Sequence, residues 1–332
     1  MLYGDSVTVR SAGRTHLLAE SLVANFNLAD FVRTLCAKAE MDTGHVPSLI
    51  TILERCHHLE SLSLSAVYFA KDPPAKLYTT LQTHSQLRSF SYGFHGVESP
   101  FESIVPLLSS FRHLKILRLD RVNAMAPDRS VSSFVKRDLP MWGPPPRYDL
   151  EELSITTWRS FDTLGWPLQG LDWLLGRTTK LKSFEAIDYV STAPLQGVFD
   201  LLNSRGCAES LQQLVVRDFQ DSTSTEPDPV DPNTLSSTFP RLTHLSLMTN
   251  SDESSFRIPT PYLRLPPRLR YLSLDEDLFL LWRLIDTIHD ETLPTSFRYL
   301  RLRGPFPSDP DVRLLRSACL EKGIECEVVR AF

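Results

Sequence analysis

The chain has 332 residues, with 35 lysines and arginines against 40 aspartates and glutamates, a formal net charge of -5 and 42% hydrophobic residues. This composition is typical of a globular chain, and it argues against a nucleic-acid-binding protein, which needs many basic side chains to neutralise phosphates. No long uninterrupted apolar stretch occurs, so the sequence predicts no membrane contact.

The first predicted element is a helix from His16 to Phe26, followed by a degenerate repeat at Val32-Leu35-Ala37. We expect residues 1–45 to form an N-terminal helical cap with this first repeat. Residues 46–332 are expected to form the main repeat domain. The division rests on the regular leucine pattern that begins after residue 45.

The pattern L-x-x-L-x-L, with conservative replacements, then recurs about every 30 residues in a chain that contains 52 leucines. Its copies begin at Leu59, Leu87, Leu114, Leu150, Leu181, Leu211, Leu242, Leu269 and Phe297. Alternate side chains of a strand point to opposite faces, so each copy predicts a short strand with its apolar residues directed inward.

Helical patterns separate these strands, for example over residues 48–57, 75–84, 102–111, 171–178, 195–203 and 278–289. The final helix is expected to have Asp309 as its N-cap, Pro310 at its first position and Gly323 just beyond its end. A single strand–helix unit cannot bury its apolar face, but a stack of such units can. The sequence therefore predicts an α/β solenoid with parallel strands on a concave face and helices on a convex face.

A closed eight-stranded α/β barrel has a similar strand–helix alternation. Its strands are buried on both faces and are nearly continuous in Val, Ile and Leu. Here the strands alternate, as in Ser-Leu-Ser-Leu and Arg-Leu-Arg-Leu, so one face must meet water. The open solenoid is the preferred interpretation.

These repeats resemble the leucine-rich repeat superfamily, in particular its irregular ribonuclease-inhibitor-like members. Three segments, HLLAESLVANFNLADFVRTL, LPPRLRYLSLD and LRSACLEKGIECEVV, resemble the C-terminal substrate-recognition region of fungal F-box/leucine-rich-repeat proteins. No F-box pattern is seen in residues 1–50. The Asn that usually follows the first leucine by eight positions occurs only at Asn250, so the usual ladder of buried Asn side chains must be replaced.

Two insertions interrupt the regular spacing, at residues 123–149 and 220–237. The first contains the run Pro144-Pro145-Pro146 beside Met141 and Trp142. An exposed Trp on a rigid loop is typical of an interaction hot spot, so Met141 and Trp142 are a candidate partner-binding loop; a plain surface loop is the alternative. The second insertion is acidic and rich in Ser, Thr and Pro, a composition that predicts little ordered structure.

No nucleotide-binding, zinc-protease or hydrolase motif is present. We therefore expect no enzyme activity, no catalytic residues, no cofactor and no metal. The five cysteines form no C-x-x-C pair, which favours a reduced compartment, the cytoplasm or nucleus. Cys56-His57-His58 is a conceivable metal cluster, but consecutive helical side chains diverge, and packing of Cys56 under a helix is the simpler interpretation.

The third, fifth and seventh positions of each copy should face outward on the concave wall. Tyr and Arg are enriched at binding hot spots, and guanidinium groups suit carboxylate or phosphate oxygens, so the last repeats are expected to contact an acidic or phosphorylated segment. The candidate partner-binding residues of this wall are Arg118, Asp120, Glu152, Glu185, Arg217, Tyr271, Asp275, Tyr299, Arg301 and Arg303. A merely solvated basic edge is the alternative.

The resemblance implies a protein-interaction scaffold that recognises a protein substrate of a ubiquitin ligase. A Skp1-like adaptor would be a partner only if an F-box lies upstream. The first alternative is a binding or regulatory protein outside any ligase, with a protein as its partner. The second alternative is an enzyme on an α/β barrel.

Overall fold

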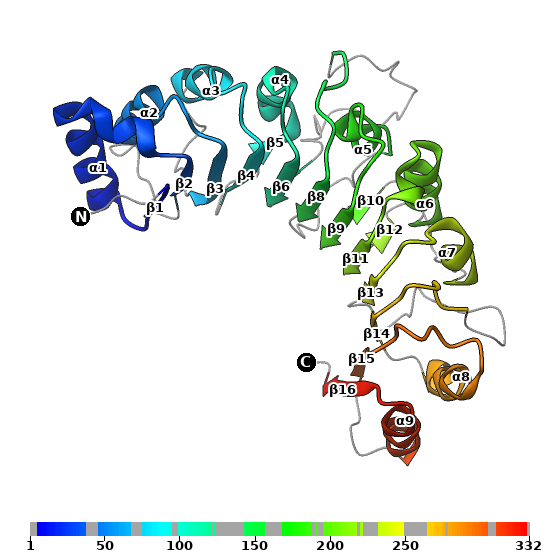
Figure 1. The fold of residues 1–332 in the computed structure, drawn as a ribbon. Helices are drawn as coiled ribbons and strands as arrows, with labels where there is room; N and C mark the ends of the chain where they lie inside the picture. The colour runs from blue at the N-terminus through cyan, green and yellow to red at the C-terminus, as the bar shows by residue number, and fades with distance from the viewer. Residues whose placement is uncertain are drawn as a thin grey trace, which may run out of the picture. The chain divides into compact units, whose positions relative to one another are not determined.

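The computed structural model describes residues 5–37, 46–67, 75–94, 99–120, 122–123, 143–156, 168–187, 190–191, 195–217, 220–221, 232–248, 264–275, 278–304 and 310–330. The chain divides into two compact units, Met1–Thr178 (unit 1) and Thr179–Phe332 (unit 2). Both units repeat one motif, a parallel strand followed by a helix (Figure 1).

The sheet of unit 1 is built from six strands that pair in chain order. These strands are β1 (Ser6–Val9), β2 (Thr34–Ala37), β3 (Ser61–Val67), β4 (Ser89–Phe94), β6 (Ile116–Asp120) and β8 (Glu152–Thr156). The helices between them are α1 (Ala12–Ala24), η1 (Phe26–Phe31), α2 (Val46–Arg55), α3 (Ala75–Gln82), α4 (Phe101–Ser110) and, after β8, α5 (Leu168–Leu175).

Unit 2 also has six main strands in chain order. They are β9 (Ser183–Ile187), β11 (Gln213–Arg217), β13 (His244–Met248), β14 (Tyr271–Asp275), β15 (Tyr299–Gly304) and β16 (Glu325–Arg330). Its helices are α6 (Leu195–Ser204), η2 (Cys207–Glu209), α7 (Pro232–Thr238), α8 (Leu278–His289) and α9 (Pro310–Glu321).

Every strand pair is parallel, and neither run of strands closes on itself. Within each unit the labelled helices lie on one side of the strands (Figure 1). The fold is thus the open α/β solenoid of leucine-rich repeats that the sequence predicted, and it is not a closed barrel. We call the side of each sheet opposite its helices the open face.

At the template positions the strands pair in register, so equivalent positions of neighbouring repeats lie level with one another. Leu62 pairs with Phe90, and Phe90 with Leu117; in unit 2, Leu245 pairs with Leu272 and Leu272 with Leu300. All three apolar positions of each of the nine copies are buried. One face of each sheet therefore joins a continuous core under the helices, and the driving force is the removal of this apolar surface from water.

A recurring backbone contact joins successive repeats just before each strand. The carbonyl of Arg33 accepts hydrogen bonds from the amides of both Glu60 and Ser61, at 2.8 and 3.0 Å. The carbonyl of Glu60 does the same for Arg88 and Ser89. Equivalent double acceptors in later repeats are the carbonyls of Arg88, Lys115, Lys182, Gln212, Thr243 and Arg270. We call this series the carbonyl ladder.

Short second ladders follow some of the main strands. β5 (Ser99–Pro100) pairs with β7 (Val122–Asn123), and β10 (Val190–Ser191) pairs with β12 (Gln220–Asp221). Both pairs are parallel and lie where the chain leaves the sheet. Backbone pairing thus supplies hydrogen bonds between neighbouring turns near the position where Asn side chains were expected and are missing.

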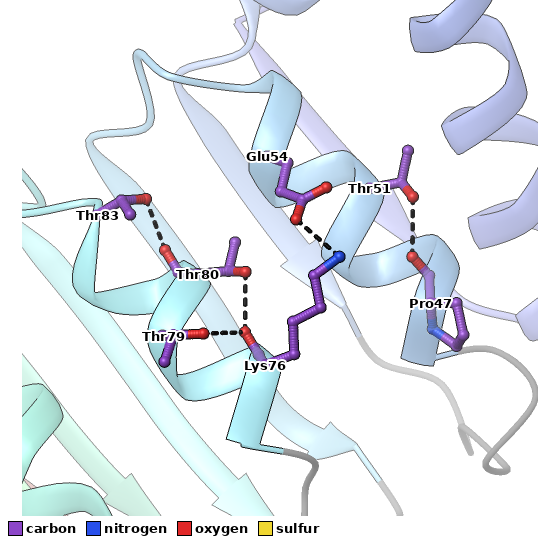
Figure 2. A network of polar contacts seen from close by, with 7 residues as sticks. All are labelled: Pro47, Thr51, Glu54, Lys76, Thr79, Thr80 and Thr83. Atoms are coloured by element: carbon purple, nitrogen blue, oxygen red, sulfur yellow. Dashed lines mark hydrogen bonds and ion pairs between the residues drawn. The ribbon is translucent and has the colours of Figure 1, made fainter.

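The helix layer also carries polar contacts. In Figure 2 the ammonium of Lys76 on α3 reaches Glu54 on α2, with Nζ and Oε1 3.0 Å apart. Three threonine hydroxyls nearby, those of Thr51, Thr79 and Thr80, donate to backbone carbonyls of their own helices. Since the ion pair is exposed, it contributes at most about 1 kcal/mol, and the buried leucines hold these helices in place.

The predicted helix boundaries agree with the structure to within a few residues. Two other predictions were wrong. The chain does not open directly into a helix, because Ser6–Val9 forms β1, which pairs with β2. The segment 220–237 was expected to lack order, yet its ends form β12 and α7, with Leu235 buried at 1% exposure. Residues 124–142 and 222–231 of the two insertions lie outside the described residues.

Candidate functional site

The open face of unit 1 is lined mainly by small polar side chains. Strand alternation places the third and fifth positions of each copy there, opposite the buried leucines. In β3 and β4 these positions are Ser61, Ser63, Ser89 and Ser91, all partly exposed. These four serines of β3 and β4 offer hydroxyl groups but no large anchor.

Three of the predicted site residues lie on β6 and β8 in unit 1. Arg118 and Glu152 form an exposed ion pair, with Nη2 and Oε2 3.2 Å apart. Asp120 is half-buried and pairs in the ladder with Gly93, where a Cβ would come within 2.6 Å of the Asp120 Cβ. Gly93 therefore leaves the space that Asp120 occupies.

The open face of unit 2 differs because it carries three distinct rows across its strands. Third positions contribute Gln213, His244, Tyr271, Tyr299 and Glu325, in consecutive ladder register. Fifth positions contribute Glu185, Val215, Ser246, Ser273, Arg301 and Glu327. Arg217 and Arg303 occupy seventh positions, where Arg303 pairs in the ladder with Asp275.

The rings of His244, Tyr271 and Tyr299 form a stack that we call the aromatic row. The Tyr271 and Tyr299 rings have centroids 4.9 Å apart and planes within 8° of parallel. His244 continues the stack at 5.8 Å and 24° from Tyr271. Burial, with the positive charge of Arg270 as a smaller cause, lowers the pKa of His244 below 6.5, so its ring is neutral near pH 7.

Val215, Ser246 and Ser273 form a second row, the small-residue row. Their exposed fractions are 6%, 2% and 1%, although no described helix covers this face. The Ser246 hydroxyl and the Arg217 Nε are both buried without a hydrogen-bond partner within the part of the chain that is described. Buried hydroxyl and N–H groups normally have hydrogen-bond partners, so two such groups without one distinguish this face from an ordinary sheet surface.

Polar contacts tie the last two strands of unit 2 together. The Tyr299 hydroxyl donates to Glu327 Oε2 at 2.5 Å, and Arg301 Nε lies 3.4 Å from the same oxygen in an ionic contact without hydrogen-bond alignment. The bond to Glu327, with smaller contributions from burial and nearby charge, raises the pKa of Tyr299 to about 12. Arg301 is thus engaged within the chain rather than held free for an acidic partner.

Register therefore brings the predicted site residues together within each unit. Glu185, Arg217, Tyr271, Tyr299, Arg301 and Arg303 lie on the open face of unit 2, and Asp275 belongs to the same sheet. Met141 and Trp142 lie outside the described residues. The sequence analysis missed His244, Ser246, Glu325 and Glu327. The signal that could have found them is their position: His244 and Ser246 are the third and fifth residues of their copy, and Glu325 and Glu327 alternate with apolar residues in the last strand.

Other chemistry-bearing residues are used in packing. Cys56 is buried, which raises its pKa to about 11. The thiols of Cys319 on α9 and Cys326 on β16 share a hydrogen bond, which raises the pKa of Cys319 and lowers that of Cys326. Within the described ranges no group of three or more His, Cys, Asp or Glu residues is placed to hold a metal ion.

None of the described helices is both long enough and apolar enough to span a bilayer. No protein-family model matches the chain, and no curated protein matches it either.

Proposed function

We propose that the chain is a protein-interaction scaffold that binds a partner protein on the open face of unit 2. The observation that carries this proposal is the aromatic row beside the small-residue row, on a sheet face that no described helix covers. Stacked tyrosines supply a rigid contact area at low entropic cost, which suits them as anchors for a partner protein.

The substrate-recognition role in an F-box-type ubiquitin ligase is the proposed biological setting. It rests on the resemblance of the three sequence segments named above. In that setting the open face would select a protein for ubiquitination, and a separate F-box would contact the adaptor.

A regulatory binding protein outside any ligase is the second candidate. The same open face serves this role, since a binder of this kind needs only the solenoid, which residues 5–37 join as β1, α1, η1 and β2.

The binding proposal is tested by affinity capture from cells in which the proteasome is inhibited. The double variant Tyr271→Ala/Tyr299→Ala should recover specific partners at least about tenfold less than the wild type, because loss of a hot-spot pair costs more than about 1.4 kcal/mol. Trp282→Ala is the matched control: this aromatic residue of α8 in the same unit is exposed and lies in the helix layer. Full recovery of every partner by a double variant of wild-type thermal stability would refute the proposal.

The two settings are separated by adaptor association. Ligase recruitment predicts that the endogenous full-length protein co-purifies with the adaptor and that its partners accumulate when the protein is depleted. A regulatory binder shows partner capture without either effect.

A further inference from the structure

The aromatic row ends at Tyr299, and its outer ring face is placed beside a carboxylate. The centroids of Tyr271 and Tyr299 are 4.9 Å apart, close to the spacing of about 4.8 Å between neighbouring strands. The two rings are stacked, with planes within 8° of parallel, so one ring covers a face of the other. One face of Tyr299 meets Tyr271, and the other looks toward β16, where the ladder partner of Tyr299 is Glu325.

The carboxylate of Glu325 supplies the negative charge at this position. Its side chain is exposed, and within the described residues its carboxylate makes no hydrogen bond or ion pair. Glu327 on the same strand is already occupied by the Tyr299 hydroxyl and by Arg301. The negative charges of Glu327 and Glu325 both contribute to the raised pKa of Tyr299, which agrees with a negative potential around its ring.

We infer that the Tyr299 ring face and the Glu325 carboxylate bind an arginine side chain of the partner protein. A guanidinium group is flat, so it stacks on an aromatic face, where the ring quadrupole attracts it. Its N–H groups also reach a carboxylate at the edge of the same plane. This inference rests on the proposed function and adds the chemistry of the residue that is recognised.

An acidic partner residue at the same place is disfavoured by the in-chain contacts. Arg301, the cation expected from the sequence to attract such a residue, lies against Glu327. An incoming carboxylate would have to displace Glu327 and would meet the unpaired charge of Glu325. An incoming guanidinium needs neither change.

The test uses the full chain, fluorescently labelled, on arrays of random nine-residue peptides whose central residue is fixed as Arg, Lys, Gln or Glu. The wild type should bind the Arg-centred pool roughly two- to fivefold more strongly than the Gln-centred pool, the range for an exposed cation on a ring. Glu325→Gln and Tyr299→Leu should each bring this ratio close to one. Tyr299→Phe, which keeps the ring and loses only the hydroxyl, should retain the preference.

Glu321→Gln is the control for surface charge, since Glu321 is an exposed carboxylate at the end of α9 in the same terminal repeat. It should behave as the wild type. Glu325→Gln keeps the shape of the side chain and the backbone bond from the Glu325 amide to the Arg298 carbonyl, so loss of folding is not expected. Thermal unfolding of each variant checks this point.

Equal signals from the four pools, a stronger signal from the Lys- or Glu-centred pool, or an Arg preference that survives Glu325→Gln would each overturn the arginine inference. None of these results touches the proposed function, which fails only if the Tyr271→Ala/Tyr299→Ala variant captures all partners normally. The two failures are therefore distinguishable.

Discussion

Two glycines at helix ends have the same kind of backbone conformation but different surroundings. Gly176 follows α5 with φ +57°, and Gly206 follows α6 with φ +75°. A Cβ at Gly176 would lie 2.7 Å from the carbonyl oxygen of Pro146, whereas a Cβ at Gly206 would have nothing within 4 Å. Alanine substitutions at these two glycines therefore separate the cost of a left-handed backbone conformation from the cost of a Cβ placed close to the Pro146 carbonyl.

Gly206→Ala is expected to lower the free energy of unfolding by roughly 1–2 kcal/mol, the cost of a side chain in the left-handed region. Gly176→Ala should cost more, roughly 2–4 kcal/mol, because the Pro146 backbone must also move. Urea unfolding of both variants measures the difference. Equal losses of unfolding free energy in the two variants would show that the Pro146 backbone moves away at no measurable cost.

His84 is a buried titratable residue with one satisfied ring nitrogen. Its Nε2 donates to the Leu53 carbonyl at 3.1 Å, and its Nδ1 is buried without a hydrogen-bond partner in the described part of the chain. Burial lowers the pKa of His84 below 6.5; the bond to Leu53 opposes this shift, and the charge of His57 adds to it. The folded protein therefore holds His84 neutral where the unfolded chain begins to take up a proton.

The sign of the pH effect follows from this difference. At pH 7.5 both states are neutral at His84, but below about pH 6.5 the unfolded state binds more protons, so stability falls as pH falls, by at most about 1.4 kcal/mol per pH unit. In His84→Gln the loss of stability between pH 7.5 and pH 5.5 should be smaller than in the wild type. If the wild type and His84→Gln lost the same stability over this pH range, His84 would not be the source of the effect.

Each strand depends on the burial of its template leucines. Leu117 is fully buried in β6, level with Phe90 and Leu153 in the adjacent strands. Leu117→Ala should lower the free energy of unfolding by about 2–5 kcal/mol, through lost transfer energy and a residual cavity. Arg88→Ala, at an exposed position before β4, should change it by less than about 0.5 kcal/mol. Urea unfolding measures both, and a small effect of Leu117→Ala would mean that the core collapses into the space.

The strands and most helices were predictable because the pattern L-x-x-L-x-L fixes both the spacing of the strands along the chain and the face of each strand that is buried. α7 was not predicted, because the acidic composition of 220–237 was averaged over the whole segment. Pro232 at the first helical position and the buried Leu235 and Phe239, four residues apart, carried the missed signal. β1 was missed because Ser6–Val9 has alternation but no leucine template.

The site was predictable only to the level of which residues share a face. Template register places Tyr271, Tyr299 and Arg301 together without any knowledge of coordinates. The contact of Arg301 with Glu327 and the sheltered hydroxyl of Ser246 depend on side-chain conformations, which the periodicity does not encode.

At the scale of the molecule, the main contacts between the described elements join each repeat to its own elements and to its immediate neighbours. Stability in such a stack is close to a sum of repeat and interface contributions. Local unfolding is therefore expected, and a single transition is not assured.

Hydrogen exchange of Leu62→Ala tests this locality. Leu62 is fully buried in β3 of unit 1. Amides of β2, β3 and β4 should exchange at least about tenfold faster than in the wild type, since roughly 2 kcal/mol or more is lost there. Amides of β14, β15 and β16 should change little. A uniform increase across both units would instead indicate one cooperative transition.

The carbonyl ladder has a consequence for how such a chain changes length over evolution. The carbonyl of Arg33 accepts hydrogen bonds from the amides of Glu60 and Ser61. The carbonyl of Glu60 accepts them from Arg88 and Ser89 in the same way. A gene that lost the codons for residues 61–88 would encode a seam where Ser89 follows Glu60 and meets the Arg33 oxygen in the place of Ser61. Duplication or excision of a whole period thus re-creates a junction that already exists, and the number of periods becomes a quantity that selection is free to adjust.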